Sequence, residues 1–140
     1  MGYSYDKFKS YTIQEDTAYK NSGMWEIVLN DHENADYVFT SVLYKIDDFL
    51  EANQLLPIKN NLIWTSYEDF DYLECNSSKE EAEQHASHFV PPDKCLSYIK
   101  DNHVIDLIEQ QKPADYEDMI QQLRVLIEYW EQGYYVYSWY

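Results

Sequence analysis

Apolar residues recur at helical spacing most clearly between Asp115 and Gln132. They fall three or four positions apart, which places them along one side of a helix. Asp115 suits the N-cap of this helix, and Gly133 suits the residue that follows its end. The pattern predicts a long amphipathic helix, and the aromatic residues 134–140 after it predict a terminal strand. The residues of the apolar stripe are Tyr116, Met119, Ile120, Leu123, Ile127 and Trp130.

Shorter patterns predict the remaining elements. Strands are expected at Met24–Leu29 and Leu62–Tyr67, and helices at Lys79–Phe89, Pro92–Asp101 and Val104–Gln110. Residues 6–20 and 30–36 are polar and give no prediction of a strand. Residues 37–54 fit either a strand followed by a helix or one long helix. Strands near both ends, with helices gathered in the second half, predict an α+β fold in which a small, mostly antiparallel sheet packs against several helices.

The size and charge of the chain narrow the range of functions. Its 140 residues, expected as a single domain over 1–140, include 26 Asp and Glu against 10 Lys and Arg, for a formal net charge of -16. It is also 45% hydrophobic and 17% aromatic, enough to build a core. Like charges repel in a compact state, so we expect a cationic partner to offset them. The chain lacks the basic surface that nucleic acid or an anionic membrane requires, so that partner is expected to be a basic protein.

The expected compartment is the cytoplasm. The sequence has no run of about 18 apolar residues, and residues 1–10 contain no apolar stretch of the kind found in a secretory signal. In a reducing compartment, Cys75 and Cys95 are expected to be free thiols rather than a disulfide.

Acidic residues gather in clusters, one of which is interleaved with the aromatic residues Tyr67, Phe70 and Tyr72. Acidic side chains accelerate the approach of a basic partner, and desolvated aromatic side chains anchor it. The alternative is that each cluster is a solvated face whose aromatic residues belong to the core. We predict that the partner is bound by Glu68, Asp69, Asp71 and Tyr72, with Asp47, Asp48 and Glu51 as a second group.

Glu81, His85 and His88 share one face of a predicted helix, at a spacing that zinc and di-iron sites use. Their order is not H-E-x-x-H, and a solvated polar helix explains the same residues. The sequence also lacks a glycine-rich phosphate loop, a G-x-S-x-G turn and a C-x-x-C pair. We therefore expect neither an enzyme nor a cofactor or metal site, with a small enzyme or metal protein built on these three residues as an alternative.

The segment 104–136 contains a short helix, a break at Gln111 and Pro113, a longer helix ending in paired aromatic residues and a final β segment. In this order it resembles small acidic bacterial proteins, several of which are immunity proteins of polymorphic and contact-dependent toxin systems. The resemblance implies a cytoplasmic protein that binds and neutralises the C-terminal domain of its toxin. Such toxins are often nucleases, and an acidic inhibitor can occupy a basic cleft by mimicking phosphate charge.

We therefore predict an immunity protein that inhibits a cationic toxin domain, a nuclease in the first instance, in a non-catalytic one-to-one complex. A phage-type DNA mimic that blocks a restriction or CRISPR nuclease would use the same electrostatics and is the first alternative. A subunit that self-associates through exposed aromatic residues is a further one.

Overall fold

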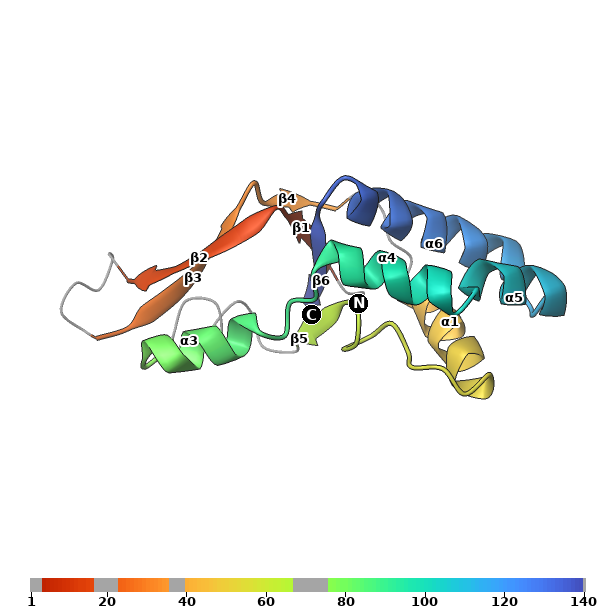
Figure 1. The fold of residues 1–140 in the computed structure, drawn as a ribbon, viewed down its shortest axis with the longest axis horizontal. Coiled ribbons are helices and arrows are strands. Elements are labelled where there is room, and N and C mark those ends of the chain that lie inside the picture. The colour runs from red at the N-terminus through yellow and green to blue at the C-terminus, as the bar shows by residue number, and fades with distance from the viewer. Residues whose placement is uncertain (1–3, 17–22, 36–39, 67–75, 140) are drawn as a thin grey trace.

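The computed structural model describes residues 4–16, 23–35, 40–66 and 76–139. The strands are β1 (Ser4–Phe8), β2 (Ser10–Glu15), β3 (Trp25–Asn30), β4 (Glu33–Asn34), β5 (Trp64–Ser66) and β6 (Tyr135–Trp139). The helices are α1 (Thr40–Ala52), α3 (Lys79–Ala86), α4 (Pro92–Asp101), α5 (Val104–Gln111) and α6 (Tyr116–Glu131). Figure 1 shows an elongated molecule with a small sheet at its middle, a β-hairpin and α3 on one side of it, and the helices α1, α4, α5 and α6 on the other. The predicted α+β fold is confirmed.

The central sheet joins the two ends of the chain. Its strand order is β4-β1-β6-β5, with β1 antiparallel to both neighbours and β5 parallel to β6. The sheet is therefore mostly antiparallel, as expected, and 134–140 supplies its terminal aromatic strand. The four residues of β1 from Tyr5 to Phe8 are all buried, and Asp6 and Lys7 are among them. The sequence pattern did not predict β1, because these two charged residues interrupt its apolar character.

The hairpin of β2 and β3 forms a second, two-stranded sheet beside α3. Side chains alternate between its two faces. Ile13, Ile27 and Leu29 belong to a cluster with Phe8, Phe89 and the small residues of α3, Ala82 and Ala86. The other face is polar: the Asn30 side chain donates to the hydroxyls of Ser10 and Thr12, each at 3.1 Å. Ser10, Thr12 and Gln14, part of the polar segment that suggested no strand, lie on this other face of the hairpin.

The four helices α1, α4, α5 and α6 enclose the larger core. In α6 the stripe is confirmed at Met119, Leu123 and Trp130, and the buried face also includes Gln122, Leu126 and Tyr129. Gly133 follows the helix with a φ of +86°, as predicted. Asp115 occupies the N-cap position, as predicted, but its backbone is left-handed and its side chain makes no capping hydrogen bond. Its carboxylate instead lies 2.5 Å from Lys45 Nζ on α1.

Residues 37–54, which fitted either a strand and a helix or one long helix, form a helix in the part that the structure describes. Residues 40–52 form α1, so a strand continuing to Tyr44 is wrong, and 36–39 lie outside the described residues. Helical spacing prevails because Ile46, Phe49 and Leu50 bury one face of α1 in the core. Within residues 30–36, for which the pattern predicted no strand, Glu33–Asn34 forms the short strand β4. None of the helices in the described ranges is long and apolar enough to cross a membrane.

Candidate binding surface

The residues predicted to bind a partner fall into two groups in the structure. Glu68, Asp69, Asp71 and Tyr72 lie outside the described residues, between the end of β5 and Asn76. Asp47, Asp48 and Glu51 all lie on α1. The second group can therefore be examined directly, and its members differ in role.

Asp47 faces inward and holds the chain that follows α1. It is only 7% exposed, and its Oδ1 and Oδ2 accept hydrogen bonds from the backbone N–H groups of Ile58 and Lys59, at 2.7 and 3.2 Å. Burial raises the pKa of this carboxyl above its ordinary value, and the two backbone bonds partly oppose the shift. These contacts make Asp47 a structural residue, and we remove it from the set that touches a partner.

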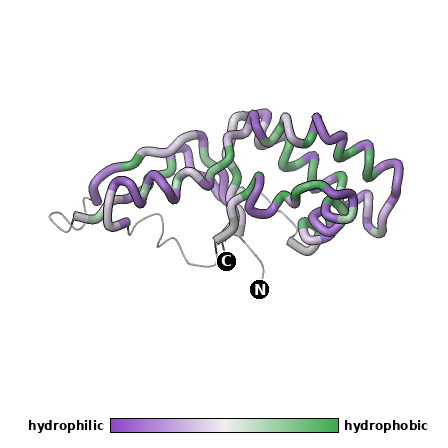
Figure 2. The backbone as a smooth tube through the Cα atoms, turned by 60° about the horizontal axis from the view of Figure 1, so that its bottom comes forward, coloured by the Kyte–Doolittle hydropathy of each residue, from purple (hydrophilic) through white to green (hydrophobic). Residues whose placement is uncertain are grey.

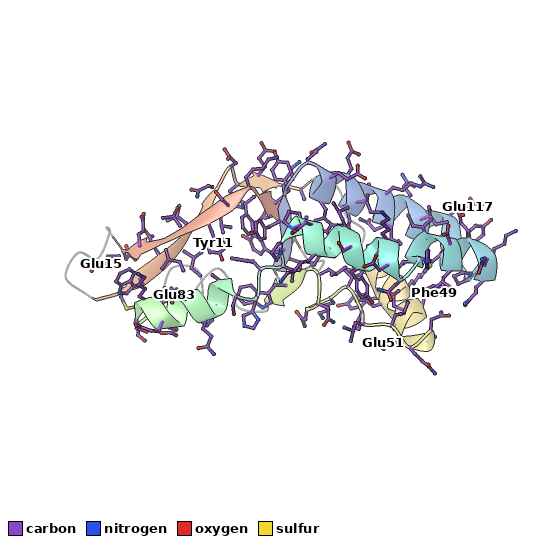
Figure 3. The ribbon with its side chains drawn as sticks, in the orientation of Figure 1. Tyr11, Glu15, Phe49, Glu51, Glu83 and Glu117 are labelled. Carbon is purple, nitrogen blue, oxygen red and sulfur yellow. The ribbon has the colours of Figure 1, made fainter. Side chains whose placement is uncertain are left out.

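Asp48 and Glu51 are exposed on the opposite side of α1 from its buried residues. Tyr44 lies four residues before Asp48 and seven before Glu51, so the three share one helical face. In Figure 3, Glu51 projects away from the end of α1, while Phe49 points toward the neighbouring helices. This arrangement leaves one aromatic and two acidic side chains directed at solvent.

A second apolar side chain lies in the turn that follows α1. Leu56 is 60% exposed and Tyr44 is 46% exposed, the two highest values among the large hydrophobic residues that the structure describes. The turn is fixed on both sides: Asp47 holds Ile58, and the Tyr98 hydroxyl on α4 donates to the Leu56 carbonyl at 2.5 Å. We name the exposed residues Tyr44, Asp48 and Glu51 of α1, together with Leu56 of the turn that follows it, the α1 patch. Sequence reasoning missed Tyr44 and Leu56, although the spacing of Tyr44 from Asp48 was a signal that could have indicated it.

Basic residues near the α1 patch are already engaged. Lys45 pairs with Asp115 at 2.5 Å, which ties α1 to the start of α6. Lys59 Nζ lies 5.5 Å from the centre of the Tyr44 ring, within the range of a cation–π contact. The local charge of Asp48 and Glu51 therefore has no ion-pair partner among the described residues.

Two lysines of the central sheet region are likewise used within the fold. Lys7 is buried, with its Nζ 4.4 and 4.7 Å from the ring centres of Tyr129 and Tyr134 and 3.7 Å from Glu33 Oε2. Lys9 lies over Tyr134 at 4.1 Å and donates to the Gln132 carbonyl. Two of the few lysines are therefore engaged in contacts within the fold, which leaves the exposed surface strongly acidic.

Acidic side chains occupy both ends of the elongated molecule. Figure 3 places Glu15 and Glu83 at the hairpin end and Glu117 at the far end of the helical layer. In Figure 2 the hairpin and α3 carry long hydrophilic stretches, whereas hydrophobic and hydrophilic segments alternate along the helices of the other side. Charge alone therefore does not single out one site, and the exposed Tyr44 and Leu56 distinguish the α1 patch.

The three residues of the alternative metal site, Glu81, His85 and His88, contact other side chains in the structure. Glu81 Oε2 accepts from the backbone N–H and the hydroxyl of Ser77, at 2.7 and 2.5 Å, and these bonds lower the pKa of its carboxyl. His85 Nδ1 lies 2.6 Å from Asn76 Oδ1, and His88 stacks on Trp64 with 4.7 Å between ring centres. Across the described ranges, no three His, Cys, Asp or Glu side chains gather as a metal site would require.

Cys95 is a free and fully buried thiol. Its Sγ lies 3.6 Å from the Leu62 carbonyl, and burial raises its pKa to about 12. Such a thiol is almost entirely protonated at neutral pH, so Cys95 does not suit a nucleophile or a metal ligand.

A groove of about 540 Å³ lies between α4, α5 and α6. Its lining is mainly aliphatic, and the charged residues along it, Lys100, Asp106 and Glu131, carry both signs. This mixture gives no preference for a cationic ligand.

Comparison with protein families, with curated proteins and with solved structures found no match for this chain.

Proposed function

We propose that this chain is a binding protein that neutralises a cationic toxin domain, as an immunity protein does, by one-to-one contact without catalysis. The observation that carries the proposal is the α1 patch, where α1 and the turn that follows it expose two hydrophobic anchors and two acidic side chains, and hydrogen bonds to Asp47 and Tyr98 hold the turn. Anchors that lose water on binding contribute most of an interface's energy, and flanking charges raise the rate of encounter.

The charge distribution supports a basic partner in particular. The formal net charge is -16, and Lys7, Lys9, Lys45 and Lys59 all contact aromatic rings, a backbone carbonyl or a carboxylate of the same chain. A basic protein surface would relieve the resulting repulsion between acidic side chains. A nuclease domain with a phosphate-binding cleft is the toxin class that best fits this chemistry.

The test is capture of the partner with tagged protein from cells that encode it, followed by inhibition of the captured protein's activity. At about 0.15 M salt, close contacts survive while distant charges are screened. We expect a basic protein at a one-to-one ratio, whose toxic activity stops when the chain is added. Recovery of a host restriction or CRISPR subunit would instead identify a DNA mimic, and recovery of no basic protein would contradict the proposal.

Two double variants then locate the surface. Tyr44→Ala with Leu56→Ala removes the anchors, and we expect at least a tenfold loss of affinity, equivalent to about 1.4 kcal/mol. Asp48→Lys with Glu51→Lys should slow association and weaken its dependence on salt. The matched control is Glu109→Lys with Glu128→Lys, which changes the net charge equally at exposed positions of α5 and α6. Equal affinity in the α1 variants and the control would remove the α1 patch from the interface.

A further inference from the structure

The two edges of the β2–β3 hairpin can be told apart from its hydrogen bonds. Trp25 donates its backbone N–H to the Asn76 carbonyl at 2.7 Å and accepts from the Asn76 N–H at 3.1 Å. The backbone of Trp25 therefore points away from β2. Backbone direction alternates along a strand, so Ile27 and Leu29 also turn their N–H and C=O groups outward.

The strand register transfers this alternation to β2. Tyr11 lies opposite Leu29, Ile13 opposite Ile27 and Glu15 opposite Trp25. Since these partners point outward on β3, they form the pairs without mutual hydrogen bonds, and the three β2 residues direct their own N–H and C=O groups to the outer edge. The Asp16 N–H, one residue further along, donates to the Met24 carbonyl at 3.0 Å, as this alternation requires.

The outer edge of β2 is open among the residues that the structure describes. The hairpin sheet contains only β2 and β3, and five of the six β2 residues are exposed. The β3 edge differs, because Asn76 bridges it at Trp25 and its residues are half-buried or buried. β2 also lacks the Lys and Pro residues that commonly protect an exposed edge from pairing.

The side chains along this edge prescribe the chemistry of a paired strand. On one face the Tyr11 ring is 37% exposed. Its centre lies 5.7 Å from that of the Phe89 ring and 6.2 Å from that of the Tyr135 ring, so the three form an aromatic cluster. On the other face Gln14 donates to the Glu26 carboxylate at 2.7 Å. A complementary strand would place apolar side chains beside Tyr11 and basic side chains on the face of Glu26.

Charge decides between a second copy of this chain and a different partner. The elements β2, β3 and α3 carry Glu15, Glu26, Glu80, Glu81 and Glu83, against Lys79 as their one Lys or Arg. Two copies meeting edge to edge would bring these acids together, which is unfavourable. A cationic strand meets complementary charge instead.

We propose that the outer edge of β2 is a second interaction surface, which binds an extended basic segment of a partner protein by adding it as a strand. The edge is distinct from the α1 patch, and its link to the proposed function is limited to the expectation of a cationic protein. Backbone bonds from Tyr11, Ile13 and Glu15 supply the pairing, and alternating apolar and basic side chains on the partner supply the selectivity.

The probe is a synthetic peptide of eight alternating lysine and valine residues, about the length of a typical strand. The control peptide has the same sequence and charge, with every backbone amide N-methylated so that it cannot pair. NMR on the unsubstituted protein should show at least tenfold slower amide exchange at Tyr11, Ile13 and Glu15 when the first peptide is bound. The control should bind at least tenfold more weakly. Equal binding of both peptides, or shifts spread over the acidic surface without protection of these amides, would overturn the proposal.

A pair of variants provides an independent measure. Ile13→Pro removes an outward N–H while leaving the bonds to β3, a position where an edge strand tolerates proline. Ile13→Ala removes the same packing and keeps the N–H. We expect the proline variant to bind the lysine–valine peptide at least fivefold more weakly than the alanine variant, and equal binding would refute strand addition. If circular dichroism shows that Ile13→Pro does not fold, the peptide comparison on the unsubstituted protein decides.

Failure of strand addition can be separated from failure of the proposed function. Asp48→Lys with Glu51→Lys should leave the protection of the β2 amides in place, because α1 does not form part of the hairpin. Protection at β2 together with unchanged capture by the α1 variants would refute only the α1 patch. Weakened capture by the α1 variants, together with no protection of the β2 amides, would refute only the strand-addition surface.

Discussion

Replacing Asp47 measures how strongly one buried carboxylate holds the chain after α1. Asp47→Ala removes the acceptor of the Ile58 and Lys59 N–H groups. A buried donor left without a partner costs about 1–3 kcal/mol, and bonds to an ionised acceptor are among the stronger ones. Ile58 is fully buried, whereas the half-buried Lys59 remains accessible to water, so most of the loss arises at Ile58. We expect a total loss of about 2–4 kcal/mol in the free energy of unfolding.

This loss converts to a large change in melting temperature. Unfolding entropy scales with length, and for 140 residues it is about 0.3 kcal/mol per kelvin at the midpoint. The expected loss therefore lowers the midpoint by about 7–13 °C. Thermal and urea unfolding followed by far-UV circular dichroism would measure it. Asp47→Asn, which keeps one acceptor oxygen, should fall between the wild type and Asp47→Ala.

The neighbouring acid supplies the control. Asp48→Ala removes an exposed carboxylate from the same helix, and we expect a change within about 0.5 kcal/mol. If Asp47→Ala melts within about 2 °C of Asp48→Ala, the two backbone bonds do not hold the loop and the inference is wrong.

The pH dependence of the same residue has a definite sign. Burial raises the pKa of Asp47 in the folded state above its ordinary value of 3.8. The folded state therefore holds this proton more tightly than the unfolded state does. The stabilisation from protonation is full below pH 3.8 and is lost as the pH rises through the raised pKa. The stability of the wild type relative to Asp47→Asn should fall over that interval, and a rise would contradict the assigned shift.

Three further predictions concern single positions. With a pKa of about 12, Cys95 should react with iodoacetamide at pH 8 roughly a thousandfold more slowly in the folded protein than in urea. Mass spectrometry of its peptide measures the two rates, and equal rates would refute its protection. The Ser78 hydroxyl accepts from the Glu81 N–H at 3.1 Å, so Ser78→Ala should cost about 1 kcal/mol in urea unfolding, while the exposed Ser97→Ala serves as a near-neutral control. Gly133→Ala should cost about 1–2 kcal/mol in the same assay because of its φ of +86°, and a neutral result would refute the left-handed assignment.

The parts of the fold that the sequence predicts are those with local patterns. The stripe of α6 and the position of Gly133 each follow from a few neighbouring residues, and each is confirmed. β1 shows the opposite case. Asp6 and Lys7 look like surface residues, yet Tyr137 and His32 contact the first at 3.2 Å each, and two tyrosine rings cover the second. Tyr137 lies about as far along the chain from Asp6 as the molecule allows, so no local pattern indicates the pairing.

The adjacent acids of α1 show the same limit at the candidate site. Asp47 and Asp48 are indistinguishable in sequence, and helical spacing alone puts them 100° apart without saying which faces the core. The inward orientation of Asp47 is set by the loop after α1, which brings the Ile58 N–H to the Asp47 carboxylate. The exposure of Leu56 has the same origin, because the loop that Asp47 holds also fixes where Leu56 emerges.

Exposed charge and buried charge have separate tasks in this molecule. The lysines of β1 and its flank are held against tyrosine rings, where a short side chain could not reach, so they contribute packing to the central sheet rather than balance to the surface. Replacing Lys7 by Met would keep most of that packing but would remove the charge that contacts the two tyrosine rings and Glu33. The substitution should therefore change fold stability far more than partner binding. Charge reversal at Asp48 and Glu51 should do the opposite. A chain in which both changes affected stability alike would have an acidic surface that serves the fold, and the expectation of a cationic partner would lose its physical basis.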